Sequence, residues 1–365
     1  MADAGGIRRI GVLTSGGDCA GLNPIIRAVV HHAKRAYGWD VIGVRYGTDG
    51  LVRRPVDAIE IDFDDVPGYV MMMSGTFLGT TSRGDPFTSR DAAGRPADLS
   101  DAIVEGYRLL GLDALIGIGG DGSLSILRRL ARKGGWNLVG VPKTIDNDVG
   151  LTDTAIGFAT AVHVATEALD RLHFTAASHQ RVMVLEVMGR DAGHIALRAG
   201  IAGAADVILI PEIPYTMEAI KEKLDRRVER GRNYSLIVVA ESVPTEDGER
   251  VTHSTGDGQR RYGGIGHHLA ARITEMTGAE TRVTVLGHVQ RGGIPSAVDR
   301  VLGSAFGVAA VDLIAQGRFD RMVAWQGRSV VDVAIEDAIA SYAQVDPRDP
   351  LVHTARGLGI CLGDE

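Results

Sequence analysis

Short apolar runs alternate along the chain with segments of helical periodicity. The run Ile10–Thr14 is almost entirely apolar, and in Asn23–Tyr37 the apolar side chains recur three and four residues apart. The first pattern predicts a strand and the second an amphipathic helix. The same alternation predicts further strands at Val41–Arg45, Ala114–Ile118, Leu138–Val141, Val182–Val187, Val207–Ile210, Leu236–Ala240, Arg282–Leu286 and Met322–Trp325, and long helices at Ala155–Leu172 and Arg300–Gln316.

This alternation predicts the fold class. Strands that are apolar throughout and separated by helices are typical of parallel sheets covered on both faces, so we expect an α/β protein. At roughly 150 residues per domain, a chain of 365 residues makes about two domains or one large α/β unit. Two segments break the pattern: Gly79–Ser100 is predicted to be a long functional loop and Pro244–Gly264 a polar surface excursion.

Composition narrows the function classes. Lys and Arg total 39 against 46 Asp and Glu, which gives a net charge of −7 and argues against nucleic acid as a partner. The chain has no apolar stretch of about 18 residues, so no membrane span is expected. Its two cysteines, Cys19 and Cys361, cannot form a disulfide framework and suit a reducing compartment. With no signal-peptide pattern at the N-terminus, we expect a cytoplasmic protein.

The chemistry-bearing residues gather where predicted strands end. In parallel α/β sheets, ligands bind beyond the carboxyl ends of the strands. Six predicted strands run into polar or glycine-rich segments, namely SGGD after Thr14, GGDGS after Ile118, PKTIDND after Val141, MGRDAG after Val187, Glu241 after Ala240 and GHVQRGG after Leu286.

Two of these segments are candidate phosphate loops. In Ser15–Asn23, Gly16 and Gly17 would let the backbone approach a phosphate before a helix N-terminus, although a tight turn is an equal alternative. Gly117–Ser123 matches the G-x-G-x-x-G pattern, but Asp121 inside it would repel a pyrophosphate. A Mg²⁺ ion held by Asp121 would remove that repulsion, and a capping aspartate is the alternative.

The segment Pro142–Asp148 is the most informative one. Asp146 and Asp148 flank Asn147, and carboxylates this close repel each other unless they have different tasks. One could act as a base toward a hydroxyl and the other could serve the metal, while Lys143 could stabilise a transferring phosphoryl group. The alternative is a turn with solvated acids.

Basic residues near strand ends predict an anion pocket, because arginine suits phosphate recognition. Glu241 would suit sugar hydroxyls, or would be the buried partner of an arginine. Two phosphate-bearing ligands, a metal, a base and a polyol pocket together indicate phosphoryl transfer to a sugar phosphate. The basic residues are Arg181, Arg190, Arg282, His288 and Arg291.

From IGVLTSGGD through GGDGS, TIDND, EVMGRDAG and GHVQRGG to the last helix, the chain resembles the 6-phosphofructokinases of the phosphofructokinase A family. The resemblance implies two Rossmann-like three-layer αβα lobes with mainly parallel sheets and the active site between them. It implies a donor lobe at residues 1–150 plus part of the C-terminal region, a fructose 6-phosphate lobe at 151–315, and a C-terminal strand, helix and tail at 316–365.

The resemblance also implies residue roles. Asp146 resembles the base that deprotonates the sugar 1-hydroxyl, and Asp121 resembles the Mg²⁺ ligand, assisted by Asp148. Thr144 would contact the attacked phosphoryl group beside Lys143 and Arg190. The donor phosphates would be held by Gly17, Arg83, Gly120, Asp121, Gly122 and Ser123. Fructose 6-phosphate would be bound by Thr144, Asp146, Met188, Gly189, Arg190, Glu241, His288 and Arg291.

Arg181 and Arg282 resemble two arginines that the family supplies from a neighbouring subunit. This likeness implies a homo-oligomer, usually a tetramer. At the effector site Arg27 matches the family, but His31 and His173 stand where arginines are expected, so activation by ADP is not expected.

The motifs disagree about the phosphoryl donor. Gly122 is typical of the ATP-dependent members and Lys143 of the pyrophosphate-dependent ones, while Ile126 stands where many ATP enzymes have a glycine. We favour ATP, because the aspartate that pyrophosphate enzymes carry at position 122 would crowd and repel an α-phosphate, and such an added carboxylate excludes ATP more firmly than an added lysine does. A reversible pyrophosphate-dependent enzyme is the alternative, and a non-catalytic sugar-phosphate sensor is a remote one.

Overall fold

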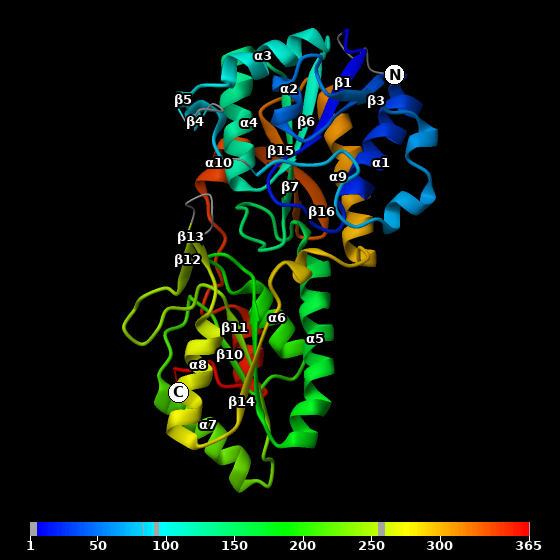
Figure 1. Ribbon diagram of the computed structural model, residues 1–365. Coiled ribbons are helices and arrows are strands. Elements are labelled where there is room, and N and C mark those ends of the chain that lie inside the picture. The colour runs from blue at the N-terminus through cyan, green and yellow to red at the C-terminus, as the bar shows by residue number, and fades with distance from the viewer. Residues whose placement is uncertain (1–5, 83, 91–94, 255–259, 365) are drawn as a thin grey trace. The chain divides into compact units, whose positions relative to one another are not determined.

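The structure is a computed structural model that describes residues 6–82, 84–90, 95–254 and 260–364. It confirms the α/β class and places a strand at each of the nine predicted positions. The chain forms two compact units (Figure 1). Unit 1 comprises the chain up to Ile145 with Val149–Thr160 and Arg291–Tyr342, and unit 2 comprises Asp146–Asp148, Ala161–Gln290 and the chain from Ala343.

Unit 1 is built on one large sheet with the strand order β16-β15-β7-β6-β1-β2-β3. Its central strands are parallel, whereas β3 and β16 pair antiparallel at the two edges and were not predicted from the sequence. A short strand, β8, also pairs with β7. The strands are β1 (Arg9–Thr14), β2 (Asp40–Val44), β3 (Ala58–Glu60), β6 (Ala114–Gly119), β7 (Leu138–Thr144), β8 (Ile156–Gly157), β15 (Arg321–Gln326) and β16 (Ser329–Ala334).

Helices cover this sheet on both faces. Helices α1 (Leu22–His32) and α9 (Ala297–Ala315) pack together on one face, and α1 runs on through a π-helical turn to Tyr37. On the other face, α4 (Asp121–Gly134) packs on β6 and β7 (Figure 1). Helices α3 (Ser100–Leu109) and α10 (Ile335–Ala340) contact α4, and α2 (Thr48–Val52) contacts α3.

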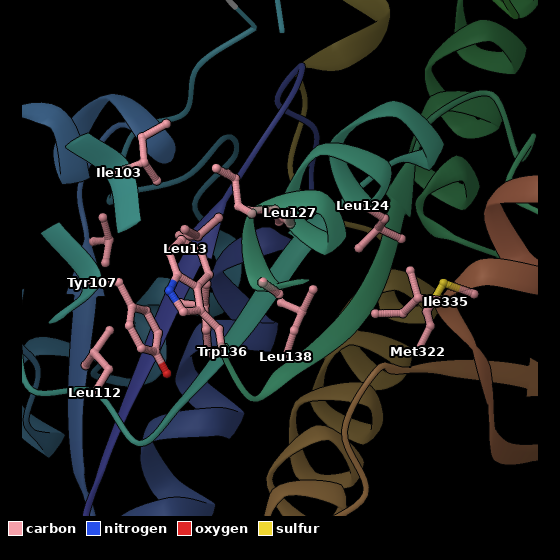
Figure 2. Packing of buried hydrophobic residues seen from close by; sticks show 14 of the residues in the cluster. Leu13, Ile103, Tyr107, Leu112, Leu124, Leu127, Trp136, Leu138, Met322 and Ile335 are labelled. Carbon is pink, nitrogen blue, oxygen red and sulfur yellow. The ribbon is translucent and has the colours of Figure 1, made fainter. Parts of the chain in front are cut away.

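The core beneath α4 joins apolar side chains of strands and helices. Leu13 and Leu138 of the sheet pack with Leu127 of α4 (Figure 2). Tyr107 of α3 stacks on Trp136 with ring centroids 4.4 Å apart. Such an offset aromatic pair adds about 0.5–1.5 kcal/mol to the stabilisation from area burial. The core therefore holds β7, the strand that contains the first residues of the PKTIDND segment.

Unit 2 contains a smaller sheet, β10-β11-β9-β14, in which every pair is parallel. Helix α5 begins at Phe158, later than predicted, because Ile156 and Gly157 pair with β7 as strand β8. The other elements are β9 (Val182–Val187), α6 (His194–Ala202), β10 (Val207–Leu209), α7 (Met217–Glu229), β11 (Ser235–Ala240), α8 (Ile265–Thr277), β14 (Thr281–Val285) and α11 (Pro350–Gly357), with α5 ending at His179.

The two irregular segments each contain a small ladder. In Gly79–Ser100, β4 (Ser89–Arg90) pairs with β5 (Pro96–Ala97). In Pro244–Gly264, β12 (Thr252–Ser254) pairs with β13 (Arg260–Tyr262). None of the helices in the described ranges combines the length and the apolar character needed to cross a membrane.

The unit boundaries differ from the predicted ones: Asp146–Asp148 falls in unit 2, residues 151–160 and 291–315 fall in unit 1, and the chain from Ala343 joins unit 2. Helix α9, expected in the second domain, belongs to unit 1, where the buried Asp299 accepts hydrogen bonds from the N–H groups of Gly157 (2.9 Å) and Thr160 (2.8 Å). The chain from Ala343 belongs to unit 2, where Cys361 exchanges backbone hydrogen bonds with Asp206 and Ile208 beside β10. Both contacts join residues far apart in sequence, which local patterns do not reveal.

Replacing Gly307 with alanine tests the close contact of α9 with α1. A Cβ at Gly307 would lie 2.6 Å from the Ile25 carbonyl oxygen and 2.7 Å from the Ala28 Cβ. Because both obstacles are fixed by the helix backbone, Gly307→Ala should lower the free energy of unfolding by about 1–3 kcal/mol in urea titrations. Gly357→Ala is the control, since a Cβ there meets no atom within 4 Å. Equal midpoints for the two variants would contradict the packing argument.

Candidate active site

The first glycine-rich loop follows β1 and is held by its own backbone. The Gly16 N–H donates to the Thr81 carbonyl (2.8 Å), and the Thr80 hydroxyl donates to the Gly16 carbonyl (2.7 Å). Gly16 has φ +84°, a conformation that favours glycine, and a Cβ there would lie 2.9 Å from the Ser123 Oγ. The loop thus lies directly against the second glycine-rich segment.

The second loop opens helix α4. Gly120 occupies the N-cap position without a side-chain cap, and Asp121 is the first helical residue, so the alternative of Asp121 as the capping residue is wrong. Gly122 is exposed, and a Cβ built on it meets no atom within 4 Å. The N–H groups of a first helical turn attract anions, and Gly122 keeps this turn open. Ile126, one turn further on, packs against the core.

Two cationic side chains reach the first loop. Lys143 is almost completely buried, and its Nζ donates to the Gly17 carbonyl at 2.6 Å. Arg291 Nη1 donates to the Asp18 carbonyl at 3.3 Å. Arg291, which the resemblance assigned to fructose 6-phosphate, therefore lies at the loop assigned to the donor. Arg83, the other expected donor contact, lies outside the described residues.

The TIDND segment is buried. Thr144, Asp146 and Asp148 expose 9%, 8% and 1% of their surface, so the alternative of a turn with solvated acids is wrong. Asn147 has φ +57°, which asparagine tolerates better than most residues. Arg190 approaches Asp148 with Nη1 3.4 Å from Oδ2, so a guanidinium lies beside the carboxylate that was expected to assist the metal.

The MGRDAG loop of unit 2 is held through its backbone N–H groups. Met188 donates to the side-chain oxygen of Gln290 (2.8 Å), and Gly189 (3.4 Å) and Arg190 (3.1 Å) donate to Glu241 Oε1. Arg190 itself has φ +52°, a rare conformation for a residue with a side chain. Sequence reasoning missed Gln290, whose only signal was its place within GHVQRGG.

Burial dominates the electrostatics of Glu241. It raises the pKa of this carboxyl to about 7, although the N–H groups of Arg190 and Gly189 favour the charged form, and the nearby Asp146 raises the pKa further. The alternative was that Glu241 is the buried partner of an arginine, and Glu241 does accept a hydrogen bond from Arg190, through the backbone N–H of that residue. Glu241 therefore changes its charge near neutral pH.

Four of the basic residues belong to unit 2, where they lie at different ends of its strands, and Arg291 belongs to unit 1. Arg181 and Arg282 share Glu280 as a partner, with Arg181 Nη2 2.9 Å from Glu280 Oε1. They lie at the amino ends of β9 and β14, whereas Arg190 follows the carboxyl end of β9. The remaining member, His288, is exposed in a short 3-10 turn after β14.

Over the residues that the structure describes, no three His, Cys, Asp or Glu side chains form a cluster able to hold a metal. Mg²⁺ does not require one, because it is commonly bound by one or two carboxylates plus substrate phosphates and water. Asp121, beside the open first turn of α4, fits that kind of partial ligand set.

The fold and these loops together indicate a class of protein. It is an α/β protein with glycine-rich segments at the carboxyl ends of parallel strands, one of which opens a helix, an arrangement typical of phosphate binding. The family follows from comparison with known proteins, since residues 9–314 match the family model described as Phosphofructokinase. The chain belongs to the phosphofructokinase family.

Relatives match the chain over nearly its whole length. It is 62% identical over 361 residues to a Synechocystis sp. protein named ATP-dependent 6-phosphofructokinase 1, covering 99% of this chain and 100% of that protein. A Nostoc sp. protein of the same name is also 62% identical, covering 98% and 99%. Phosphofructokinase from Pichia pastoris, solved in the T-state, is 30% identical with a TM-score of 0.79. That match covers 97% of this chain but only 37% of the yeast chain.

The raised pKa of Glu241 predicts how stability changes with pH. When a carboxyl has a higher pKa in the folded chain than in the unfolded chain, the folded state becomes less stable as the pH rises from the unfolded pKa to the folded pKa. Between about pH 4.5 and 7, wild type should therefore lose stability relative to Glu241→Gln, which cannot ionise there. Urea midpoints of both chains, measured across this range, check the prediction. A midpoint difference that does not change with pH would contradict it.

Proposed function

We propose that the protein transfers the γ-phosphoryl group of MgATP to the 1-hydroxyl of fructose 6-phosphate, giving fructose 1,6-bisphosphate in glycolysis. The observation that carries the proposal is the match, at 62% identity over nearly the full length, to proteins named ATP-dependent 6-phosphofructokinase 1. The open space at Gly122 supports ATP as the donor. A cytoplasmic location belongs to the same proposal.

Asp146 is the proposed general base. It is a buried carboxylate within the TIDND segment, and in this role it accepts the proton of the sugar 1-hydroxyl as that oxygen attacks the γ-phosphorus. Thr144, two residues earlier, is proposed to contact the attacked phosphoryl group. Burial supports the role, because a carboxylate that is shielded from water exchanges protons with the bound hydroxyl rather than with solvent.

The donor contacts proposed in unit 1 surround the two glycine-rich loops. Lys143 holds the carbonyl of Gly17 and supplies a cation near this loop. Mg²⁺ bound by Asp121, with Asp148 as the further proposed ligand, would neutralise charge on the donor phosphates. The backbone N–H groups at the start of α4 would orient the same phosphates. The proposed donor contacts are Gly17, Arg83, Gly120, Asp121, Gly122 and Ser123.

The acceptor contacts are proposed around the MGRDAG loop. Glu241 holds the N–H groups of Gly189 and Arg190 and presents its remaining oxygen to sugar hydroxyls. Met188 and His288 are further proposed contacts in unit 2, and Arg291, at the first glycine-rich loop, is the contact proposed from unit 1. Arg181 and Arg282, at the opposite ends of their strands, are proposed to serve a neighbouring subunit of a homotetramer, because they lie away from the loop of their own chain.

Pyrophosphate is the second candidate donor, and Lys143 is the observation that favours it. Its ammonium group lies at the donor loop, where it would suit the higher charge density of pyrophosphate. Initial rates with ATP, GTP and pyrophosphate, measured side by side on the purified chain, test the proposal. Turnover with pyrophosphate but not with ATP would reverse the donor assignment, and no turnover with any donor would favour a non-catalytic sugar-phosphate sensor.

Removing the ionisable group of Asp146 tests the base. Asp146→Asn should lower kcat by ~10²–10⁴, which is the usual contribution of a general base, while the KM values change little. Steady-state rates against both substrates measure the effect. Asp64→Asn, at an exposed position of unit 1, is the matched control and should keep wild-type rates. An unchanged kcat in Asp146→Asn would exclude this residue as the base.

Donor choice is tested by adding a carboxylate at Gly122. The open space there should let Gly122→Asp fold normally, but the new charge should lower kcat/KM for ATP by roughly 10²-fold or more, since an unfavourable like-charge contact costs several kcal/mol. Gly68→Asp, at another exposed glycine where an added Cβ would meet no atom within 4 Å, should leave the rate unchanged. If Gly122→Asp keeps full activity with ATP, the donor does not pass Gly122.

A further inference from the structure

The last residue of the MGRDAG loop donates its backbone N–H to a separate side chain. The Gly193 N–H, at the start of α6, donates to Glu212 Oε1 (2.9 Å) and Oε2 (3.1 Å). A Cβ at Gly193 would lie 2.7 Å from Glu212 Oε2 and 2.4 Å from the Ile210 Cβ, so this approach requires glycine. Glu212 follows β10 and lies far in sequence from Gln290 and Glu241, which hold the first part of the loop.

Glu212 also holds the chain where it returns to unit 2 near its C-terminus. The Val345 N–H donates to Glu212 Oε1 at 2.9 Å, so one carboxylate oxygen joins the returning segment Ala343–Val345 to the MGRDAG loop. Within the same segment, the Ala343 N–H donates to the Asp148 carbonyl (3.0 Å). The Ala343 carbonyl lies 3.1 Å from His194 Nε2, and burial lowers the pKa of this imidazole, which keeps it a neutral partner.

We propose that Glu212 is a positioning residue that fixes the fructose 6-phosphate loop relative to the Asp146–Asp148 segment. The inference rests on the proposed function, because it assigns Arg190 and Asp146 to the sugar substrate. Arg190 lies within the loop that Glu212 holds, and its guanidinium contacts Asp148. Ala343–Val345 connects Glu212 with the backbone of the same Asp148. The carboxylate of Glu212 therefore constrains both partners of the Arg190–Asp148 contact.

A positioning role and a merely structural role predict different kinetics. Loss of Glu212 as a structural group would lower the fraction of folded enzyme and reduce the rate without changing either KM. Loss of a positioning group would leave the donor contacts of unit 1 intact and weaken binding of the sugar phosphate, because its loop would sample other conformations. The ratio of the two KM values therefore separates the two roles.

The experiment compares Glu212→Met, Glu212→Gln and Glu222→Met in the full chain. Methionine has a similar length but no oxygen, so it leaves the N–H groups of Gly193 and Val345 without their acceptor. The KM for fructose 6-phosphate should rise about tenfold, which corresponds to a lost hydrogen bond to a charged group. The KM for ATP should stay within about twofold of wild type. Glutamine retains one acceptor oxygen and should restore most of the affinity.

Glu222→Met is the matched control on α7, where Glu222 pairs with Arg226 on the exposed helix surface. Such surface pairs contribute little, so both KM values should be those of wild type. If Glu212→Met does not fold, Glu212→Gln carries the test, because loss of its charge should still raise the sugar-phosphate KM about threefold. A wild-type sugar-phosphate KM in the folded Glu212 variants, or an equal rise in both KM values, would overturn the inference. A wild-type chain that does not phosphorylate fructose 6-phosphate would instead overturn the proposed function, and the inference with it.

Discussion

The register of the parallel strands in unit 1 brings three separate motifs together. Thr14 of β1 lies opposite Ile118 of β6, and Ile118 lies opposite Val141 of β7. Because parallel strands point the same way, the segments SGGD, GGDGS and PKTIDND leave the sheet at one edge. The contact between Lys143 and Gly17, and the close approach of Gly16 to Ser123, both depend on this alignment. A slip of one residue would turn every side chain of the shifted strand to the other face and would break these contacts.

A similar register in unit 2 brings together the side chains that accept hydrogen bonds from the MGRDAG loop. Val187 of β9 lies opposite Ala240 of β11, so Met188 and Glu241 begin at the same level of the sheet. The N–H groups of the loop then find side-chain oxygens of Gln290, Glu241 and Glu212. These bonds compensate for the unusual backbone conformation of Arg190. The arrangement leaves the partly buried Glu241 carboxyl with a raised pKa, since burial disfavours its charged form.

Local patterns predicted much of this protein from the sequence. Central strands such as β1, β6, β7 and β11 were predicted because a strand buried on both faces must be apolar, and this requirement is visible in any window. Edge strands such as β3 and β16 carry mixed patterns and escaped the same reasoning. The motifs were found from residue types, and the family match agrees with them. Gln290 and Glu212 were missed, because an acceptor for a backbone N–H group can be any polar side chain that the fold brings near.

The sequence alone determined the α/β class, the strand ends that bear the chemistry and the family, since each depends on residue type and short-range spacing. Tertiary structure decided which of those residues meet. It buried both acids of the TIDND segment, placed Arg291 at the first glycine-rich loop, and gave Arg181 and Arg282 the same partner, Glu280. It also assigned α9 to unit 1. The physical reason is that burial and pairing depend on contacts between residues far apart along the chain, which no local pattern encodes.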